Sequence, residues 1–509
     1  MVLERQQQEL KRKQASIAAN EVKRQKMMEK QEKNTEKDEE TMDMEETPPA
    51  PKQVSLSVER LKAKAGISVR QCEKVAREVN PAVGRSVIQS RSAHKRAWKK
   101  KETPFCADDS VVTYADIIGR LEALHRHFPD ADCLRISSDK GGKCIKTSVA
   151  FARGQSEYDV QILHAVIADK ESYDVFFNNV FYIYHQVNWY CSAHHLTMIV
   201  TCDHKVTSML LGHKGQSAKH PCWLCTLPQS EFEHYTHQNV QPFVRSLVDI
   251  EDAAARVAPV NKRRDQLRAA KKRRTTAQKQ HDDRIELKAA SIANVPLNST
   301  PTQQYVPAPL HTFMGICGDI INDWITKLFG EGPVHAALCR HGIFFNRNSG
   351  HGLDGNAVKK LFTVADKVLQ SLNLLRPLSD YYWHLFASLA HLYELSMCTR
   401  KLQPFELTDF ADAIDSYIYW RAEICKVLYN SYDSSERRYT PKEHMLICHF
   451  LPFIRQHGSM GLFSEQAHEK IHHAFNVEAS RIPGRSAQAV AKCIKSVNEN
   501  HLSHLSLSV

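Results

Sequence analysis

The 509-residue sequence has no long apolar run, no secretory leader pattern and only one closely spaced cysteine pair. No stretch approaches the 18 or more consecutive apolar residues of a membrane-spanning helix, which excludes a transmembrane role, and we expect no membrane partner. The first residues, MVLERQQQELKRKQ, lack the apolar segment of a signal peptide. The 14 cysteines are scattered rather than arranged as a compact disulfide framework, which favours a reducing intracellular compartment.

Positive charge is concentrated in two short segments. Of a formal net charge of +11, most falls in residues 51–103, which hold 14 Lys and Arg side chains against 4 acids. A second run, Lys262 to Lys279, has nine basic residues and one acid. Residues 1–55 contain too few aromatic and β-branched residues to bury a core, and we interpret them as a disordered or single-helical low-complexity tail.

Residues 56–103 predict two short amphipathic helices separated by a turn at Gly66. Ser68 and Gln71 form a capping box at the start of the second helix, which ends before Pro81. The pattern indicates a small helix-turn-helix-like domain, and a basic helical hairpin that contacts no nucleic acid fits it equally well. The candidate DNA-binding residues are Arg70, Gln71, Lys74, Arg77, Lys95, Arg96, Lys99 and Lys100.

The rest of the chain begins with strands and continues with helices. Residues 132–170 predict three strands, in DCLRISSD, CIKTSVAFARG and YDVQILHAVIADK, followed by the aromatic helix VFFNNVFYIYHQVNWY and the apolar strand HHLTMIVTC. Beyond Leu227-Pro228, three long stretches repeat apolar residues at helical spacing: KKLFTVADKVLQSLNLL, YYWHLFASLAHLYELSM and FADAIDSYIYWRAEICKVLYNSY. The fold class is therefore α+β, with a long helical segment inside or after the sheet domain.

Two of the predicted strands end in an aspartate, Asp139 and Asp203. A single strand-terminal aspartate is usually a cap or turn residue, but two can lie side by side if a divalent cation relieves their repulsion. A third acid comes from the late helix in SEQAHEKIHHAF. Glu469 is the preferred third ligand, and Glu465, which the helix dipole favours for structural reasons, is held in reserve.

The only C-x-x-C, Cys222 and Cys225, offers two thiolates to a tetrahedral zinc ion and needs two more ligands. A Thr440–Glu443 capping box with a proline at the first helical position opens a helix that carries His444 and His449. Their spacing is within the range of zinc ligands, so these four residues predict a Cys2His2 zinc site. A redox cysteine pair or an unpaired surface turn is the alternative.

The late helix also contains His468-Glu469-Lys470-Ile471-His472, which matches the H-E-x-x-H of zinc metallopeptidases. In a chain with 27 histidines, a match of five letters is weak support, and no clear third-ligand helix follows it. A metallopeptidase is therefore a third-ranked hypothesis.

The order of these motifs resembles the catalytic core of the V(D)J recombinase and of the Transib transposases over roughly residues 130–495. The shared order is strand-Asp139, strand-Asp203, CWLC, a long helical segment, HMLICH and SEQAHEK. The stretches PLHTFMGICGDIINDW (309–324) and GLDGNAVKKLF (352–362) are more loosely similar to further landmarks of that core. The chain departs from the family in its shorter length, in the brief interval between the aspartates and in a one-residue difference in spacing around the two glutamates.

The resemblance implies an RNase H-like core split by a long all-α insertion. The expected segments are the first core part at 128–225, the insertion at 226–440, the zinc-ligand helix and last core part at 441–495, and a C-terminal tail at 496–509. Asp139, Asp203 and Glu469 would bind two Mg²⁺ or Mn²⁺ ions. One structural Zn²⁺ on Cys222, Cys225, His444 and His449 would tether the insertion to the core.

The function that the resemblance implies is that of a nuclear DDE transposase, or a domesticated descendant, that cuts and joins DNA. Its partners would be transposon ends and target DNA, and it would act as a homodimer. The basic segment 56–103 would hold the transposon end, and the Lys262–Lys279 run would contact DNA backbone. The alternatives are a catalytically silent, transposon-derived DNA-binding protein and the H-E-x-x-H metallopeptidase.

Overall fold

The computed structural model describes residues 56–57, 88–89, 105–107, 110–142, 144–152, 160–270, 273–345, 352–374, 376–428, 438–482 and 486–505. In the expected helix-turn-helix-like domain it describes two short strands, β1 (Leu56–Ser57) and β2 (Ile88–Gln89), which form a two-stranded sheet. The expected tail at 1–55 and the DNA-binding candidates lie outside the described residues; these candidates are Arg70, Gln71, Lys74, Arg77, Lys95, Arg96, Lys99 and Lys100.

The main sheet is mixed and has six strands in the order β3-β4-β7-β6-β5-β8. Its strands are β3 (Phe105–Ala107), β4 (Val111–Tyr114), β5 (Cys133–Gly141), β6 (Cys144–Phe151), β7 (Gln161–Ile167) and β8 (Thr197–Val200). β5, β6 and β7 pair antiparallel in sequence, whereas β8 returns to lie parallel to β5. The predicted strands are confirmed. The sheet also includes β3 and β4, which precede the expected core boundary at 128 and which the sequence pattern did not predict.

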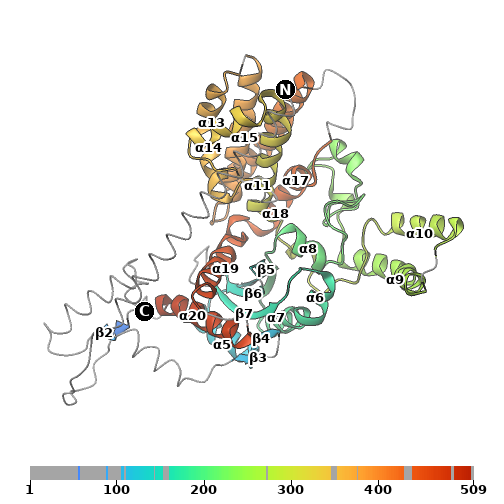
Figure 1. Ribbon diagram of the computed structural model, residues 1–509, viewed down its shortest axis with the longest axis vertical. Helices are drawn as coiled ribbons and strands as arrows, with labels where there is room; N and C mark the ends of the chain where they lie inside the picture. The colour runs from blue at the N-terminus through green and yellow to red at the C-terminus, as the bar shows by residue number, and fades with distance from the viewer. Residues whose placement is uncertain are drawn as a thin grey trace, which may run out of the picture. The chain divides into compact units, whose positions relative to one another are not determined.

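Helices cover both faces of this sheet (Figure 1). The helices α5 (Ile117–His125), α6 (Tyr173–Asn179) and α7 (Phe181–Ala193) lie on one face, where Tyr184 of α7 donates a hydrogen bond to Ser138 of β5. The late helices α19 (Gln466–Ala479) and α20 (Ala487–Leu505) cover the other face, and two histidines of α19 contact Ser148 of β6. Successive side chains of a strand point to opposite faces of the sheet. Consecutive residues are buried in both β5 and β6, so both faces of these strands are covered.

The chain leaves the sheet after β8 through α8 (His204–Leu210) and a loop that contains the C-x-x-C. Two short 3-10 turns, η2 (Gln229–His234) and η3 (Gln241–Phe243), precede a helical hairpin of α9 (Leu247–Ala269) and α10 (Thr276–Lys288). After η4 (Thr302–Gln304), the chain returns to the edge of the sheet, where Tyr305 forms a parallel bridge with Val200.

A long helical segment follows, as predicted. It consists of α11 (Pro309–Asp319), the π-helix η5 (Ile320–Ile325), α12 (Thr326–Phe329), α13 (Glu331–Arg340), α14 (Gly355–Ser371), α15 (Leu378–Ser396) and α16 (Pro404–Leu428). The three long predicted helices are confirmed as α14, α15 and α16. Within the segment, α11 packs against α14, α15 and α17 (Pro441–His444), and α15 packs against α16.

The chain then returns to the sheet through a run of short elements. α17 continues into the π-helix η6 (Met445–Phe450) and α18 (Leu451–His457), and the 3-10 turn η7 (Gly461–Phe463) leads into α19. α20 continues to Leu505 and so crosses the expected start of the C-terminal tail at 496.

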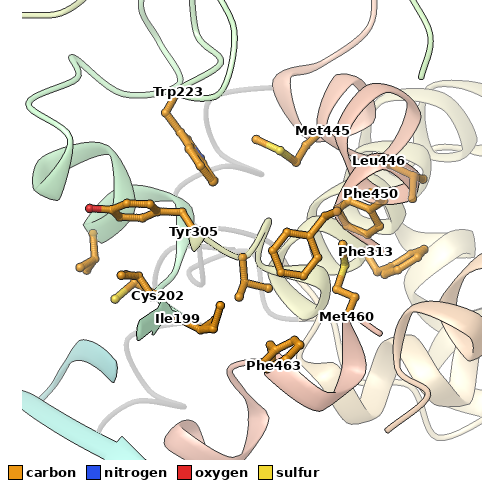
Figure 2. Packing of buried hydrophobic residues seen from close by; sticks show 14 of the residues in the cluster. Ile199, Cys202, Trp223, Tyr305, Phe313, Met445, Leu446, Phe450, Met460 and Phe463 are labelled. Atoms are coloured by element: carbon orange, nitrogen blue, oxygen red, sulfur yellow. The ribbon is translucent and has the colours of Figure 1, made fainter. Parts of the chain in front are cut away.

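One cluster of buried apolar side chains extends from the sheet into the helical segment. Figure 2 shows part of it: Tyr305 and Trp223 lie beside Ile199 of β8 and Cys202, which follows that strand, and Phe313 and Phe450 continue the packing in α11 and η6. The ring centroids of Phe313 and Phe450 lie 6.1 Å apart in an edge-to-face arrangement. No helix in the described part of the chain is long and apolar enough to cross a membrane.

Candidate acidic site and metal centre

Asp139 lies near the end of β5, which continues for two residues beyond the expected end at Asp139, and Asp203 lies three residues beyond the parallel neighbour β8. The last register pair of β5 and β8 is Ile136 with Val200, and each aspartate lies three residues beyond its member of that pair. The pairing continues past the strand, because the amide of Thr201 donates to the carbonyl of Ile136 at 2.9 Å. Both carboxylates therefore reach the same edge of the sheet.

Asp203 also has an ordinary structural role. It is the N-cap of α8, and its Oδ1 accepts a hydrogen bond of 2.6 Å from the amide of Val206. Such a cap uses one carboxylate oxygen and leaves the other for a further partner. The capping role explains why the chain turns into α8 at this point and does not account for a second aspartate beside it.

The two candidate glutamates meet a histidine from the helical segment. Glu465 directly precedes α19, and its Oε1 lies 3.1 Å from Nδ1 of His311 and 3.2 Å from the amide nitrogen of the same residue. Glu469, one turn further on, has its Oε1 at 3.6 Å from the same Nδ1. His311 belongs to α11, so this contact joins the helical segment to the acidic site.

The four acids influence one another electrostatically. Burial first, and then the charges of Glu465, Asp139 and Asp203, together raise the pKa of Glu469 to about 7 against the opposing effect of His311. Burial also raises the pKa of Asp203. Carboxylates that share a small volume resist ionisation, and a divalent cation between them removes that penalty.

His311 carries the compensating positive charge. Burial lowers the pKa of His311, but its hydrogen bond to Glu465 and the charges of Glu465, Glu469 and Asp203 raise it to about 9. The imidazolium is therefore the form present at neutral pH. The second carboxylate oxygen of Glu465, Oε2, is buried without a hydrogen-bond partner, so this acid retains unused ligand capacity.

Asp139 has its own partners on the sheet and on α19. Its Oδ2 lies 3.4 Å from Nδ1 of His472, and Lys146 lies opposite it on β6. Burial raises the pKa of Asp139, but His472 and Lys146 together lower it below its ordinary value. Lys146 donates hydrogen bonds to the carbonyl of Gly141 and to Asn476, which holds it beside the acidic site.

The four predicted zinc ligands form one buried cluster. Among the described residues, Cys222, Cys225, His444 and His449 are the group of His, Cys, Asp and Glu side chains whose ligand atoms all lie within 4.8 Å of one another. Sγ of Cys222 lies 3.4 Å from Nε2 of His449, and Sγ of Cys225 lies 3.2 Å from Nε2 of His444. Ligand bonds of about 2.0–2.3 Å to zinc give a tetrahedron with edges of about 3.5 Å, so this donor set could bind a metal such as zinc.

The surroundings of the cluster favour a thiolate on Cys222 and a neutral imidazole on His444, whereas burial and the neighbouring Cys222 raise the pKa of the Cys225 thiol. Burial raises the pKa of the Cys222 thiol, but the hydrogen bond with Cys225 and the charge of His449 lower this pKa by more than burial raises it. The net shift is therefore downward. Burial lowers the pKa of His444, whose ring stacks on Phe232 with a centroid separation of 3.7 Å. Arg245 donates to the carbonyls of Cys225 and Cys222 and fixes the backbone of the cysteine loop.

The helix with the two histidines is anchored to the helical segment. The predicted capping box is confirmed: Thr440 accepts from the amide of Glu443, and the Glu443 carboxylate accepts from the amide of Thr440. The same carboxylate accepts hydrogen bonds from Tyr417, at 2.7 Å, and from Arg421, both on α16. A buried ion pair thus holds α16 against the residue that precedes His444.

Both histidines of the H-E-x-x-H sequence contact one serine, and His472 also contacts Asp139. Nδ1 of His468 lies 2.8 Å from Oγ of Ser148, and Nε2 of His472 lies 3.1 Å from the same oxygen. Burial lowers the pKa of both histidines. The intervening glutamate, Glu469, points instead to His311.

The second basic run folds into the α9–α10 hairpin, where part of its charge is paired. Arg263 and Arg274 contact the buried carboxylate of Asp282, and Arg264 forms an ion pair of 2.5 Å with Glu286. Lys262 and Lys279 lie at the exposed surface of the hairpin. Some basic residues of this run therefore form ion pairs within the hairpin, and others are exposed to solvent.

The sequence analysis did not single out His311 as a site residue. A single histidine among apolar helical positions is more often a core residue than a partner of acids. Lys146 and Ser148 were also missed, because both lie inside a strand whose residues are all buried. Only the fold brings these side chains to the acidic site.

The segment that matches a family profile lies in the first half of the chain. A family profile described as a domain of unknown function, DUF8703, is similar to residues 93–255. The matched segment contains strands β3 to β8, Asp139, Asp203 and both cysteines of the metal cluster, and it ends before His444 and Glu469. No curated protein matches the chain.

Proposed function

We propose that this protein is a DDE-type DNA transposase, or a domesticated descendant of one, that cuts and joins DNA with divalent cations held by Asp139, Asp203 and Glu469. The observation that carries the proposal is the meeting of these acids at one edge of the sheet. They come from two neighbouring strand ends and from a helix near the other end of the chain. Their mutual effect on the pKa of Glu469 is the sign of an unneutralised cluster.

The sheet supports an RNase H-like core. Three consecutive antiparallel strands, β5, β6 and β7, are followed by a fourth, β8, that lies parallel to the first, and Tyr305 adds a parallel bridge on the outer side of β8. The resemblance to the recombinase core implies this arrangement, with the first aspartate on β5 and the second after β8. The long helical segment lies between the second aspartate and the glutamates, where that resemblance implies an insertion.

Glu469 fits the third position better than Glu465. Glu465 is buried against His311 and accepts a hydrogen bond from a backbone amide, whereas 39% of the Glu469 side chain is exposed. The charges of both aspartates act on Glu469. Glu465, with its unpartnered oxygen, stays the reserve ligand.

Bound divalent cations would activate first a water and then a 3′-hydroxyl, and would stabilise the attacking and leaving oxygens of the phosphodiester. The chain's own residues would position these groups. Asp139 and Asp203 would present their carboxylates from a rigid strand edge, and Glu469 would approach from α19. His311 would hold the two glutamates in place and balance part of their charge.

We further propose that zinc on the Cys2His2 cluster ties the helical segment to the sheet. Cys225 and His444 are separated by 219 positions, so a metal bound by both closes a very long loop. The chain reaches α19 shortly after His449, and the clip would thereby fix the glutamates opposite the aspartates. DNA binding by residues 56–103, homodimer formation and a nuclear location stay predictions of the resemblance.

The proposal is tested by a nicking and strand-transfer assay on the full chain with a supercoiled plasmid, a 3′-hydroxyl oligonucleotide and Mn²⁺ or Mg²⁺. We expect the wild type to nick and join, and Asp139→Asn, Asp203→Asn and Glu469→Gln to lose both reactions. Asp409→Asn, an exposed aspartate on α16, is the matched control and should keep full activity. Wild-type levels of nicking in all three site variants would contradict the proposal.

The same assay separates the alternatives. A catalytically silent DNA-binding protein would bind the plasmid and leave it intact with every metal. An H-E-x-x-H metallopeptidase would cleave protein substrates, and His472→Ala would abolish that cleavage without any effect on DNA. The contact of both histidines with Ser148 gives the peptidase hypothesis less support than the acid cluster gives the transposase.

A further inference from the structure

Behind the acidic site lies a buried chain of polar groups: His468, Ser148, His472 and Asp139. His468 and His472 are four positions apart on α19 and therefore lie on one face of the helix. That face packs against β6, where Ser148 lies between the two imidazole rings. The side chains of His468, Ser148 and His472 are buried. The carboxylate of Asp139, which is the last of these four polar groups, is partly exposed.

The direction of each hydrogen bond follows from counting donors and acceptors. A carboxylate accepts only, so Nδ1 of His472, 3.4 Å from Oδ2 of Asp139, carries the proton. A neutral imidazole has one donor and one acceptor, so Nε2 of His472 accepts and the Ser148 hydroxyl donates to it. The hydroxyl oxygen can then accept from Nδ1 of His468 at 2.8 Å.

Two ring nitrogens lie outside these hydrogen bonds. Nε2 of His468 and Nδ1 of His472 are both buried without a hydrogen-bond partner, and the approach of Nδ1 to Asp139 is an ion-pair contact of 3.4 Å. The two hydrogen bonds through Ser148 therefore run from His468 to His472, and the contact of His472 with Asp139 continues them to the acid.

We propose that His468, Ser148 and His472 form a positioning relay that fixes the orientation of the Asp139 carboxylate for metal binding. This inference rests on the proposed function, because it needs Asp139 to be a metal ligand. His472 contacts Oδ2 of Asp139, and the other carboxylate oxygen would be the one offered to a metal ion. Hydrogen-bonded partners of metal ligands commonly contribute 10- to 100-fold to metal affinity, so about this factor is at stake here. His472 and Ser148 are positioning residues that contact no substrate.

The relay gives the two histidines of the H-E-x-x-H sequence a role at their four-residue spacing, because both rings reach Ser148 from one face of α19. The strand position of Ser148 matters as well, because a register irregularity lies between Thr147 and Ser148 on β6. Such a bulge redirects a side chain relative to its neighbours, and here it accompanies the serine that meets both rings.

The test measures Mn²⁺ affinity of the full chain by titration calorimetry, which needs no DNA substrate. His472→Phe keeps an aromatic ring of similar size and removes both nitrogens, and we expect it to weaken Mn²⁺ binding roughly tenfold to a hundredfold. His472→Asn places an amide N–H near the position of Nδ1, and we expect it to restore most of the affinity. Ser148→Ala should give an intermediate loss, because His472 then keeps Asp139 but loses its own orientation.

Ser388→Ala is the matched control. Ser388 is a buried serine on α15 that bonds Ser416, far along the chain from the acids, and its removal should leave Mn²⁺ affinity unchanged. The far-ultraviolet circular dichroism and melting temperature of each variant show whether it is folded. Rescue by asparagine but not by phenylalanine, with both variants folded, is a result that a purely structural role does not produce.

The outcomes are distinguishable from those of the proposed function. If Asp139→Asn abolishes Mn²⁺ binding but folded His472→Phe binds with wild-type affinity, the relay is refuted and the metal site stands. If the wild type binds no Mn²⁺, both the proposed function and the relay are overturned. If phenylalanine and asparagine reduce affinity equally, the donor at the Nδ1 position has no role and the relay is again refuted.

Discussion

Nε2 of His444 and Nε2 of His449 lie 3.3 Å apart, although the two residues are five positions apart on one helix. In a regular α-helix, residues five apart point in directions that differ by roughly 140°. Here the backbone from Met445 to Phe450 is a π-helix, whose wider turn brings residues five apart onto one face. The local helix geometry thus matches the spacing of the two candidate ligands.

The first prediction concerns this cluster. Cys222→Ser removes one of four ligands from a buried site, so we expect the purified protein to lose one equivalent of zinc by metal analysis and to melt at a lower temperature. Cys339→Ser, on α13 and outside the cluster, is the matched control and should retain both the zinc and the melting temperature. Unchanged zinc in Cys222→Ser would refute the site.

The second prediction concerns the buried ion pair between Arg421 and Glu443. Arg421→Ala leaves the Glu443 carboxylate, which directly precedes His444, buried without its cation. Removing one partner of a buried ion pair typically destabilises a protein by about 3–5 kcal/mol. Lys426→Ala, at an exposed pair with Glu423 on the same helix, should cost less than about 1 kcal/mol. Denaturant unfolding of the three proteins measures both values, and equal costs for the two substitutions would contradict the anchoring role of Arg421.

The third prediction is a pH dependence of stability that arises from Glu469. Its pKa is raised from 4.5 to about 7 in the folded protein, so the folded state binds the proton more tightly than the unfolded state does. Stability therefore falls as pH rises from about 4.5 to about 7 and levels off above that range. Glu469→Gln cannot lose a proton there, and the melting temperature of the wild type relative to this variant should fall across that window in chelator-treated buffer.

The matched control for the third prediction is Glu394→Gln. Glu394 is exposed on α15, outside the acidic site, and its substitution should leave the pH profile of the wild type unchanged. A constant difference in melting temperature between wild type and Glu469→Gln from pH 5 to pH 8 would show that burial and the neighbouring acids do not raise the pKa of Glu469.

The fourth prediction separates the two roles of the second basic run. If exposed Lys262 and Lys279 contact DNA phosphates, replacing each with glutamine should reduce the slope of log affinity against log salt by about 0.9, as measured with a random duplex. Arg264 is paired with Glu286, so we expect Arg264→Gln to lower the melting temperature and to change the slope of log affinity against log salt little. Unchanged slopes in both lysine variants would assign this run to solvent alone.

Part of the fold could be predicted from the sequence because its signals are local. β5, β6 and β7 are apolar runs bounded by turns, and the long helices have clear helical periodicity. β3 and β4 were missed because they are short, at 3 and 4 residues, and are separated by the acidic residues Asp108 and Asp109. Pairing with β7 stabilises β4, and that contact has no signature in the local sequence.

The same distinction holds for the site. The four ligands of the Cys2His2 cluster were predicted from two spacings and are confirmed as one buried cluster, because pairs of metal ligands usually come from short local motifs. His311 and Ser148 contribute single side chains from elements far from the acids in sequence. Their roles depend on how α11 and β6 pack, which only the folded chain determines.

The central claim is that Asp139, Asp203 and Glu469 together hold divalent cations. It is tested most directly by anomalous diffraction from crystals of the full chain soaked in Mn²⁺. The account predicts anomalous peaks between these three carboxylates, and for a pair of ions a separation of about 3.5–4 Å. No Mn²⁺ peak at the acids, or a metal bound instead between His468 and His472, would contradict it.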